Sequence, residues 1–163
     1  MKDKDKLHNK VFELSKKLVE LKALPNQMPA WKKADDRNIY ELRLHPTEWG
    51  RYVLINMKTQ EETKPIGCYV FVNRIDEPGI IRMAKFPTYG HSSLTYYHYQ
   101  RQGESFDDNI AVYYAGKAEF GGGGELKWWT NDSGHYKPPS NLSRNFIPYV
   151  GRLLPMNFFR PLY

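Results

Sequence analysis

Residues 110–130, IAVYYAGKAEFGGGGELKWWT, place four glycines between two apolar and aromatic segments. β-Branched and aromatic residues favour strands, and glycines permit a tight reversal of the chain. A glycine run can also resemble a phosphate-cradling loop, but no helix beginning with Lys-Ser or Lys-Thr follows it here. The stretch therefore predicts a β-hairpin, and a hairpin joins antiparallel strands.

Four earlier segments have the same character and predict further strands. They cover residues 39–44, 52–57, 68–72 and 80–83, and turn signals such as Glu77-Pro78-Gly79 separate them. The predicted fold class is α+β: a mostly antiparallel β-sheet with one amphipathic N-terminal helix and an extended C-terminal arm.

Residues 4–24 predict the helix. Leu7, Val11, Leu14, Leu18 and Leu21 recur at spacings of three and four, which places them on one face, and Pro25 ends the pattern. A helix of this length needs a surface to dock on. We expect it to pack against its own sheet, with a protein partner as the alternative.

The chain of 163 residues is suited to a single domain, 1–163. Within it we expect the helix at 1–24 and a connector at 25–38. A β-rich core that carries the site follows at 39–139, and a basic arm rich in proline and aromatic residues at 140–163.

The net charge of +6 is unevenly distributed. After Ser133 the chain has no Asp or Glu but contains Lys137, Arg144, Arg152 and Arg160. Such a basic region suits a phosphate group, a nucleic acid, an anionic membrane or an acidic protein, and it also favours solubility. The single cysteine, Cys68, excludes an intramolecular disulfide and a cysteine-rich zinc site.

No apolar run is long enough to cross a bilayer, so no membrane span is expected. The N-terminal MKDKDK has no apolar core behind it and does not resemble a secretory signal peptide. We expect a cytoplasmic location in the producing cell, or delivery by a route that needs no signal peptide.

Two polar clusters stand at the ends of predicted strands: Gly90-His91-Ser92-Ser93 and residues 131–138, NDSGHYKP. Loops on a rigid sheet are common positions for binding and catalysis, and two histidines are able to serve as base and acid near neutral pH. The candidate catalytic residues are His91, His135, Ser92, Ser93 and Tyr136; the candidate substrate-binding residues are Ser133, Asn131, Lys137, Arg144 and Trp129. No cofactor is expected, and no residue is assigned as a metal ligand.

RNA phosphodiester cleavage is the simplest chemistry for this set, and a nucleic acid or nucleotide is the expected substrate. Attack by the 2′-hydroxyl needs a base, an acid and a cation, and Lys137 or Arg144 is placed to supply the cation. The alternative is that both histidines only cap turns through hydrogen bonds to the backbone.

Two other chemistries have weaker support. Cys68 with His135 and Asn131 or Asp132 has the chain order of papain-like and amidase enzymes, but a strand follows Cys68 where such a nucleophile usually begins a helix. His91, His98, His135 and Asp107 or Asp108 offer metal-ligand types without a compact ligand spacing.

A non-enzymatic module that binds nucleic acid or protein is the main alternative to an enzyme. Aromatic rings near basic residues can stack on single-stranded nucleic acid; they are Tyr96, Tyr97, Tyr99, Tyr113, Tyr114, Trp128 and Trp129. Strand alternation places Trp128 and Trp129 on opposite faces, so only one of them belongs to the core at that point.

The motifs His91-Ser92-Ser93, Ala115-Gly116 and Ser133-Gly134-His135-Tyr136-Lys137-Pro138 resemble a domain of bacterial polymorphic toxins and secreted effectors. That family's signature is His-Ser-Ser, then Ala-Gly-Glu, then Ser-Gly-His-Tyr-x-Pro, and the resemblance covers roughly residues 68–139. The resemblance implies that the chain is a toxin or effector, with a role in virulence and often secreted. It does not imply a particular reaction.

The chain departs from this signature at Lys117, where the family has an acidic residue. Glu119 would have to replace that acid if it is catalytic, or the chain is an inactive copy. An ADP-ribosyltransferase or NAD glycohydrolase, with NAD as substrate, is a third possibility that would use Arg43, Ser92-Ser93 and Glu119. Our leading hypothesis is a toxin- or effector-like hydrolase, a nuclease acting on RNA.

Overall fold

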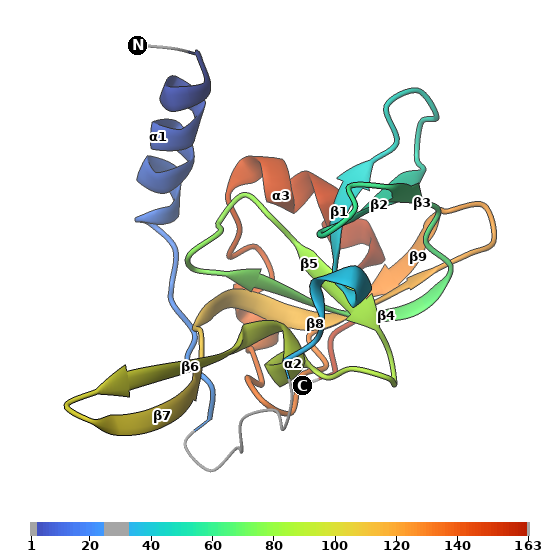
Figure 1. Ribbon diagram of the computed structural model, residues 1–163. Helices are drawn as coiled ribbons and strands as arrows, with labels where there is room; N and C mark the ends of the chain where they lie inside the picture. Colours follow the sequence, from blue (N-terminus) through green and yellow to red (C-terminus); the bar gives the residue numbers. More distant parts are fainter. Residues whose placement is uncertain (1–2, 25–32, 163) are drawn as a thin grey trace.

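The computed structural model describes residues 3–24 and 33–162, and the side chains from residue 9 onward within those ranges. Its centre is an antiparallel sheet with strand order β3-β2-β1-β5-β4-β8-β9 (Figure 1). The strands are β1 (Tyr40–Leu44), β2 (Tyr52–Asn56), β3 (Glu62–Thr63), β4 (Gly67–Arg74), β5 (Arg82–Lys85), β8 (Val112–Phe120) and β9 (Leu126–Trp129). A separate hairpin contains β6 (Tyr96–Arg101) and β7 (Glu104–Asn109).

The α+β class and the antiparallel sheet are confirmed. Each segment that predicts a strand contains one, within a few residues of the expected bounds. The glycine run 121–124 does form the turn between β8 and β9, closed by a 2.9 Å hydrogen bond from the Gly121 N–H to the Glu125 carbonyl. The short strand β3, the β6–β7 hairpin and the short helix α2 (His91–Thr95) were not predicted.

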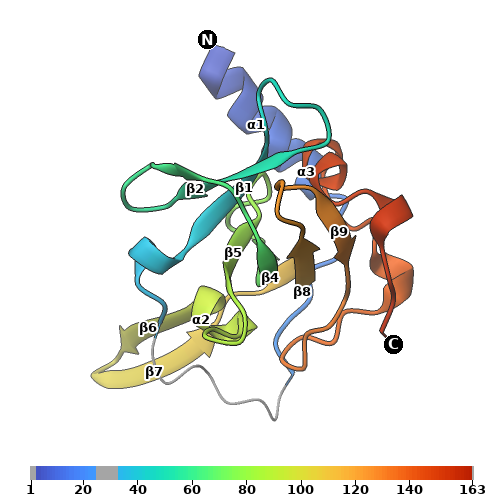
Figure 2. The same cartoon turned by 90° about the vertical axis from the view of Figure 1, so that its right-hand side faces the viewer.

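The two faces of the sheet bury different side chains. On one face, which we call the arm face, Tyr69, Phe71, Phe120 and Trp129 pack under the C-terminal segment. On the opposite face, which we call the loop face, Val70, Val72, Ala84 and Ala115 pack with Leu94 of α2 and with Tyr136. Figure 2 shows α3 (Pro148–Leu153) and α2 on different sides of the strands.

The C-terminal arm lies along β9 and covers the arm face. The Trp129 indole donates to the Pro155 carbonyl at 2.8 Å, and the Arg160 N–H donates to the Trp129 carbonyl at 2.8 Å. The arm also includes α3, which an extended arm did not predict. Pro148 suits the first helical position, because a residue there has no intrahelical partner for an N–H, and Val150 and Leu153 then reach the core.

The N-terminal helix is shorter than predicted: α1 covers Asp3–Ser15 and not residues 4–24. Beyond it, backbone groups bond to distant partners. The Asn145 side chain accepts from the Val19 N–H and donates to its carbonyl, and Leu21 exchanges two backbone hydrogen bonds with Val112. These tertiary bonds replace the helical ones that the apolar spacing predicted. Val11, Leu14, Leu18 and Leu21 still pack against the core, as expected for docking on the domain itself.

The predicted stop at Pro25 and most of the predicted connector, 25–32, lie outside the described residues. The rest of that connector, 33–38, contains a single 3-10 turn at Asp36–Asn38. None of the helices in the described ranges has the length and apolarity required to cross a bilayer.

Candidate functional site

His91 is the first residue of α2 and is buried. Its Nε2 lies 2.7 Å from the carbonyl oxygen of Gly116 in β8. The carbonyl is an acceptor, so Nε2 donates and carries the ring proton. This bond holds α2 against the middle of the sheet, which gives His91 a structural role.

Burial lowers the pKa of His91 to about 4 from an ordinary value of 6.5. The hydrogen bond to Gly116 acts in the opposite direction but does not offset the loss of solvent. His91 is therefore neutral at pH 7 and is poorly suited to be the general acid of a two-histidine mechanism.

The lowered pKa of His91 predicts a loss of stability in mild acid. The unfolded chain binds a proton at His91 between pH 6.5 and about 4, whereas the folded chain does not, so the free energy of unfolding falls as pH falls. The expected loss from this residue is roughly 3 kcal/mol. Urea unfolding at several pH values in this range measures it.

His91→Gln is the matched variant, because glutamine keeps an amide donor for the Gly116 carbonyl and does not titrate. We expect this variant to lose less stability than the parent chain over the same pH range. Parallel losses in the two proteins would show that His91 is not the titrating group.

His135 has a different environment, although it belongs to the same region. It is half-buried, and its Nε2 is enclosed without a hydrogen-bond partner among the described residues. Burial lowers the pKa of this histidine also. A buried polar nitrogen without a hydrogen bond raises the free energy of the folded chain. A polar group that formed a hydrogen bond with this nitrogen would therefore be stabilised at the site.

Lys117 and Asp132 form an ion pair in the vicinity of His91. The Lys117 Nζ lies 2.8 Å from the Asp132 Oδ2, and the lysine also lies over the ring of Phe86. Lys117, Asp132 and His135 are all close enough to His91 to act on its pKa. The helix that begins at His91 contacts the 131–138 segment through the 2.8 Å hydrogen bond between the hydroxyls of Tyr136 and Thr95.

Strand register extends this cluster across the loop face. Glu119 of β8 lies opposite Cys68 of β4 and opposite Trp128 of β9, and alternation places Lys117 on the same side of the sheet. All four side chains are partly exposed. We call Lys117, Glu119, Asp132 and His135 the polar patch.

Cys68 borders the polar patch but is not activated. Burial raises the pKa of its thiol, and the neighbouring Glu119 raises it further. A thiol with a raised pKa is a poor nucleophile at neutral pH. Cys68 lies within a strand, as the sequence indicated, which disfavours a cysteine-dependent mechanism.

The remaining candidate catalytic residues support the loops. Ser92 and Ser93 are half-buried in α2, and Ser93 accepts the Ala34 N–H through its main-chain carbonyl. Tyr136 is buried, and its hydroxyl donates to the Ile110 carbonyl at 2.7 Å. A second 2.8 Å hydrogen bond joins this hydroxyl to Thr95.

The candidate substrate-binding residues are dispersed. Ser133 is buried and accepts the Tyr136 N–H, and Asn131 is fully buried between the Pro138 carbonyl and the Leu162 N–H. Trp129 is 0% exposed and lies on the arm face, away from the polar patch. Lys137 and Arg144 are exposed, and Arg144 precedes the segment that packs Phe146 on the arm face.

Two of the alternative constellations are not assembled in the described residues. Arg43 of β1 pairs with Glu41 and is separated from β8 by β5 and β4, so it does not join Glu119 in one site. His98 pairs with Asp107 on the β6–β7 hairpin. Across the described part of the chain, no three His, Cys, Asp or Glu side chains are arranged to hold a metal ion.

The ion pair of the polar patch was missed because of a β-bulge. Phe120 pairs with Leu126, but Glu119 pairs with Trp128, so the register shifts by one residue between them. Counting back from the glycine turn without this shift places Lys117 opposite Trp129. The bulge places it instead opposite Thr130, two residues from Asp132.

Comparisons of this chain with protein families, with curated proteins and with solved structures find no match.

Proposed function

We propose that this chain is a toxin- or effector-like enzyme that cleaves RNA phosphodiester bonds at the polar patch. The toxin or effector setting rests on the Ser133–Pro138 motif and its resemblance to polymorphic-toxin domains. The observation that carries the chemistry is the half-buried ring of His135, whose Nε2 has no hydrogen-bond partner among the described residues and which follows Asp132 of the Lys117–Asp132 ion pair by three residues.

In the proposed reaction His135 is the general base. Burial lowers its pKa, which keeps the ring neutral at pH 7 and able to accept a proton. The ring takes the proton of the ribose 2′-hydroxyl, the 2′-oxygen forms a bond to phosphorus, and the bond from phosphorus to the 5′-oxygen breaks. The departing oxygen takes a proton from water, and His135 later releases its proton to solvent.

Lys117 is the cation of the site in this proposal. Its ammonium group neutralises the charge that develops on the phosphate oxygens, and Asp132 holds it in place. His91 and Tyr136 are positioning residues, because their bonds to Gly116 and Ile110 hold α2 and the 131–138 loop against the sheet. The base of this proposal is thus His135 and the cation is Lys117, so the two histidines do not act as an equivalent pair.

The test is the rate of cleavage of a fluorescently labelled RNA by the purified chain and by His135→Ala. We expect the variant to lose about 100-fold or more in rate, the usual effect of removing a general base. His98→Ala is the matched control, since His98 is exposed on the hairpin and its Nδ1 lies 2.9 Å from the Asp107 carboxylate. It should keep the parent rate.

Unfolding temperatures of both variants show whether a lost rate reflects a lost fold. Equal cleavage by His135→Ala and the parent chain would contradict the proposal. NAD is incubated in parallel, and consumption of NAD that depends on His135, without RNA cleavage, would replace the nuclease by an NAD-using enzyme.

A further inference from the structure

The β6–β7 hairpin forms an exposed surface of the molecule. It extends from the body beside α2 and lies outside the seven-stranded sheet in both views (Figures 1 and 2). Nearly every residue of its two strands is exposed. In the described part of the chain its strands pair only with each other, so both outer edges have unpaired N–H and carbonyl groups.

An isolated two-stranded hairpin is only marginally stable in water, and free strand edges tend to recruit a further strand. This hairpin carries an aromatic row on one face. Tyr97 stacks on Tyr99 with ring centroids 5.5 Å apart, and Tyr99 stacks on Phe106 at 5.2 Å. Each of the three rings is more than one-third exposed.

The charge of the hairpin is opposite to that of the rest of the chain. Residues 96–109 contain Arg101 against Glu104, Asp107 and Asp108, a net charge of −2 in a protein of net charge +6. Exposed aromatic faces and carboxylates share one preferred ligand, because both attract the guanidinium group of arginine. A nucleic acid would meet repulsion from these carboxylates.

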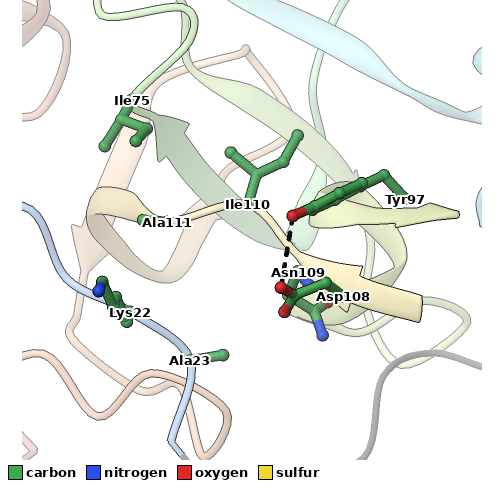
Figure 3. Close-up of a pocket in the computed structure, with 8 residues that line it drawn as sticks. All are labelled: Lys22, Ala23, Ile75, Tyr97, Asp108, Asn109, Ile110 and Ala111. Atoms are coloured by element: carbon green, nitrogen blue, oxygen red, sulfur yellow. Dashed lines mark hydrogen bonds between the residues drawn. The ribbon is translucent and has the colours of Figure 1, made fainter. Parts of the chain in front are cut away.

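A hollow of about 680 Å³ opens at the base of the hairpin. Figure 3 shows Tyr97 and Asp108 on one side of it, joined by a 3.3 Å hydrogen bond, and Lys22 on the opposite side. Its size accommodates a long side chain. Asp108 is placed to accept from a guanidinium group there, and Lys22 is placed to donate to a main-chain carbonyl.

We propose that the β6–β7 hairpin is a docking site for an extended, arginine-rich segment of a partner protein. The segment adds a strand to the hairpin edge, its arginines contact the aromatic row, and one of them enters the hollow beside Asp108. This surface is separate from the polar patch, and the proposal does not depend on the nuclease activity.

The test is fluorescence anisotropy of a labelled peptide of about ten residues with alternating arginine and valine, long enough to span a strand of this hairpin. We expect binding by the whole chain, and binding weakened about three- to tenfold in Tyr99→Ala and in Asp108→Asn. Glu61→Gln, which removes an exposed carboxylate outside the hairpin, is the matched control and should bind like the parent.

Two further probes separate strand addition from charge alone. A peptide with glutamate in place of arginine should not bind, and N-methylation of alternate residues of the arginine peptide should abolish binding by removing backbone donors. Asn has the same shape as Asp, so Asp108→Asn still tests the proposal if Tyr99→Ala disturbs the hairpin. Equal binding by all variants, or no binding up to about 1 mM peptide, would overturn the proposal.

Sedimentation equilibrium of the parent chain tests the other occupant of this surface. A dimer that Tyr99→Ala dissociates would assign the hairpin to self-association and would likewise overturn the peptide proposal.

Discussion

Replacing Gly116 with valine is expected to abolish the native fold. A Cβ at this position would lie 1.7 Å from the carbonyl oxygen of Thr130 and 3.1 Å from the ring of Phe71. The backbone at Thr130 cannot move away without breaking the hydrogen bond from the Thr130 N–H to the Lys117 carbonyl. A shift of Gly116 instead would move its carbonyl out of line with His91. We expect a loss above about 4 kcal/mol, measured by urea unfolding and near-ultraviolet circular dichroism.

Gly151→Ala is the control for this prediction. Gly151 lies within α3, and a Cβ there meets nothing within 4 Å. Alanine has the higher helix propensity, so the control should be neutral or stabilised by up to about 1 kcal/mol. A Gly116→Val protein with the stability of the parent would show that Thr130 does not approach β8 as described.

Trp129→Ala is expected to cost about 3–5 kcal/mol, the usual range for removing a large buried aromatic side chain. The ring is 0% exposed and contacts the rings of Phe71, Tyr114, Phe146 and Phe159. It joins the sheet to the C-terminal arm, so the variant should also expose the arm to proteolysis. Chemical unfolding and limited proteolysis measure the two effects.

Trp49→Ala provides the comparison, because Trp49 is 99% exposed and its removal should change stability by less than about 0.5 kcal/mol. If Trp129→Ala kept the stability of the parent and lost only RNA cleavage, Trp129 would be a substrate-binding residue, as predicted from the sequence.

The sheet was predictable because its segments carry strong local signals. The glycine run between 110–120 and 126–130 needs no tertiary information to indicate a hairpin. The β6–β7 hairpin was not predicted, because its residues YYHYQR and ESFDDN are exposed on both faces and show no alternation of apolar and polar residues.

The end of α1 and the formation of α3 depend on contacts far apart in sequence. The apolar spacing of residues 4–24 indicates a helix throughout, but Asn145, some 126 residues away, binds the backbone of Val19. Prolines in the arm indicated an extended chain, whereas Pro148 begins a helix whose apolar side chains reach the core. Neither outcome follows from local propensity.

The candidate site was located by sequence only in part. The hypothesis of one site required the 90–93 and 131–138 clusters to lie close together, and Tyr136 of the second cluster does pack with Leu94 and hydrogen-bond to Thr95 in the helix that begins at His91. The different environments of the two histidines were not predictable, because burial and the acceptor of His91 depend on how α2 packs against β8. The bulge in the β8–β9 hairpin likewise concealed the position of Lys117.

The central claim is that His91 is a structural histidine and His135 the reactive one, and a nuclear magnetic resonance titration of the histidine ring nitrogens tests it most directly. We expect His91 to keep its proton on Nε2 and to stay neutral down to about pH 5, consistent with a pKa of about 4. Between these two histidines, only the His135 signals should shift when uridine 3′-phosphate is added. Titration of His91 near its ordinary pKa of 6.5, or shifts at His91 with none at His135, would contradict it.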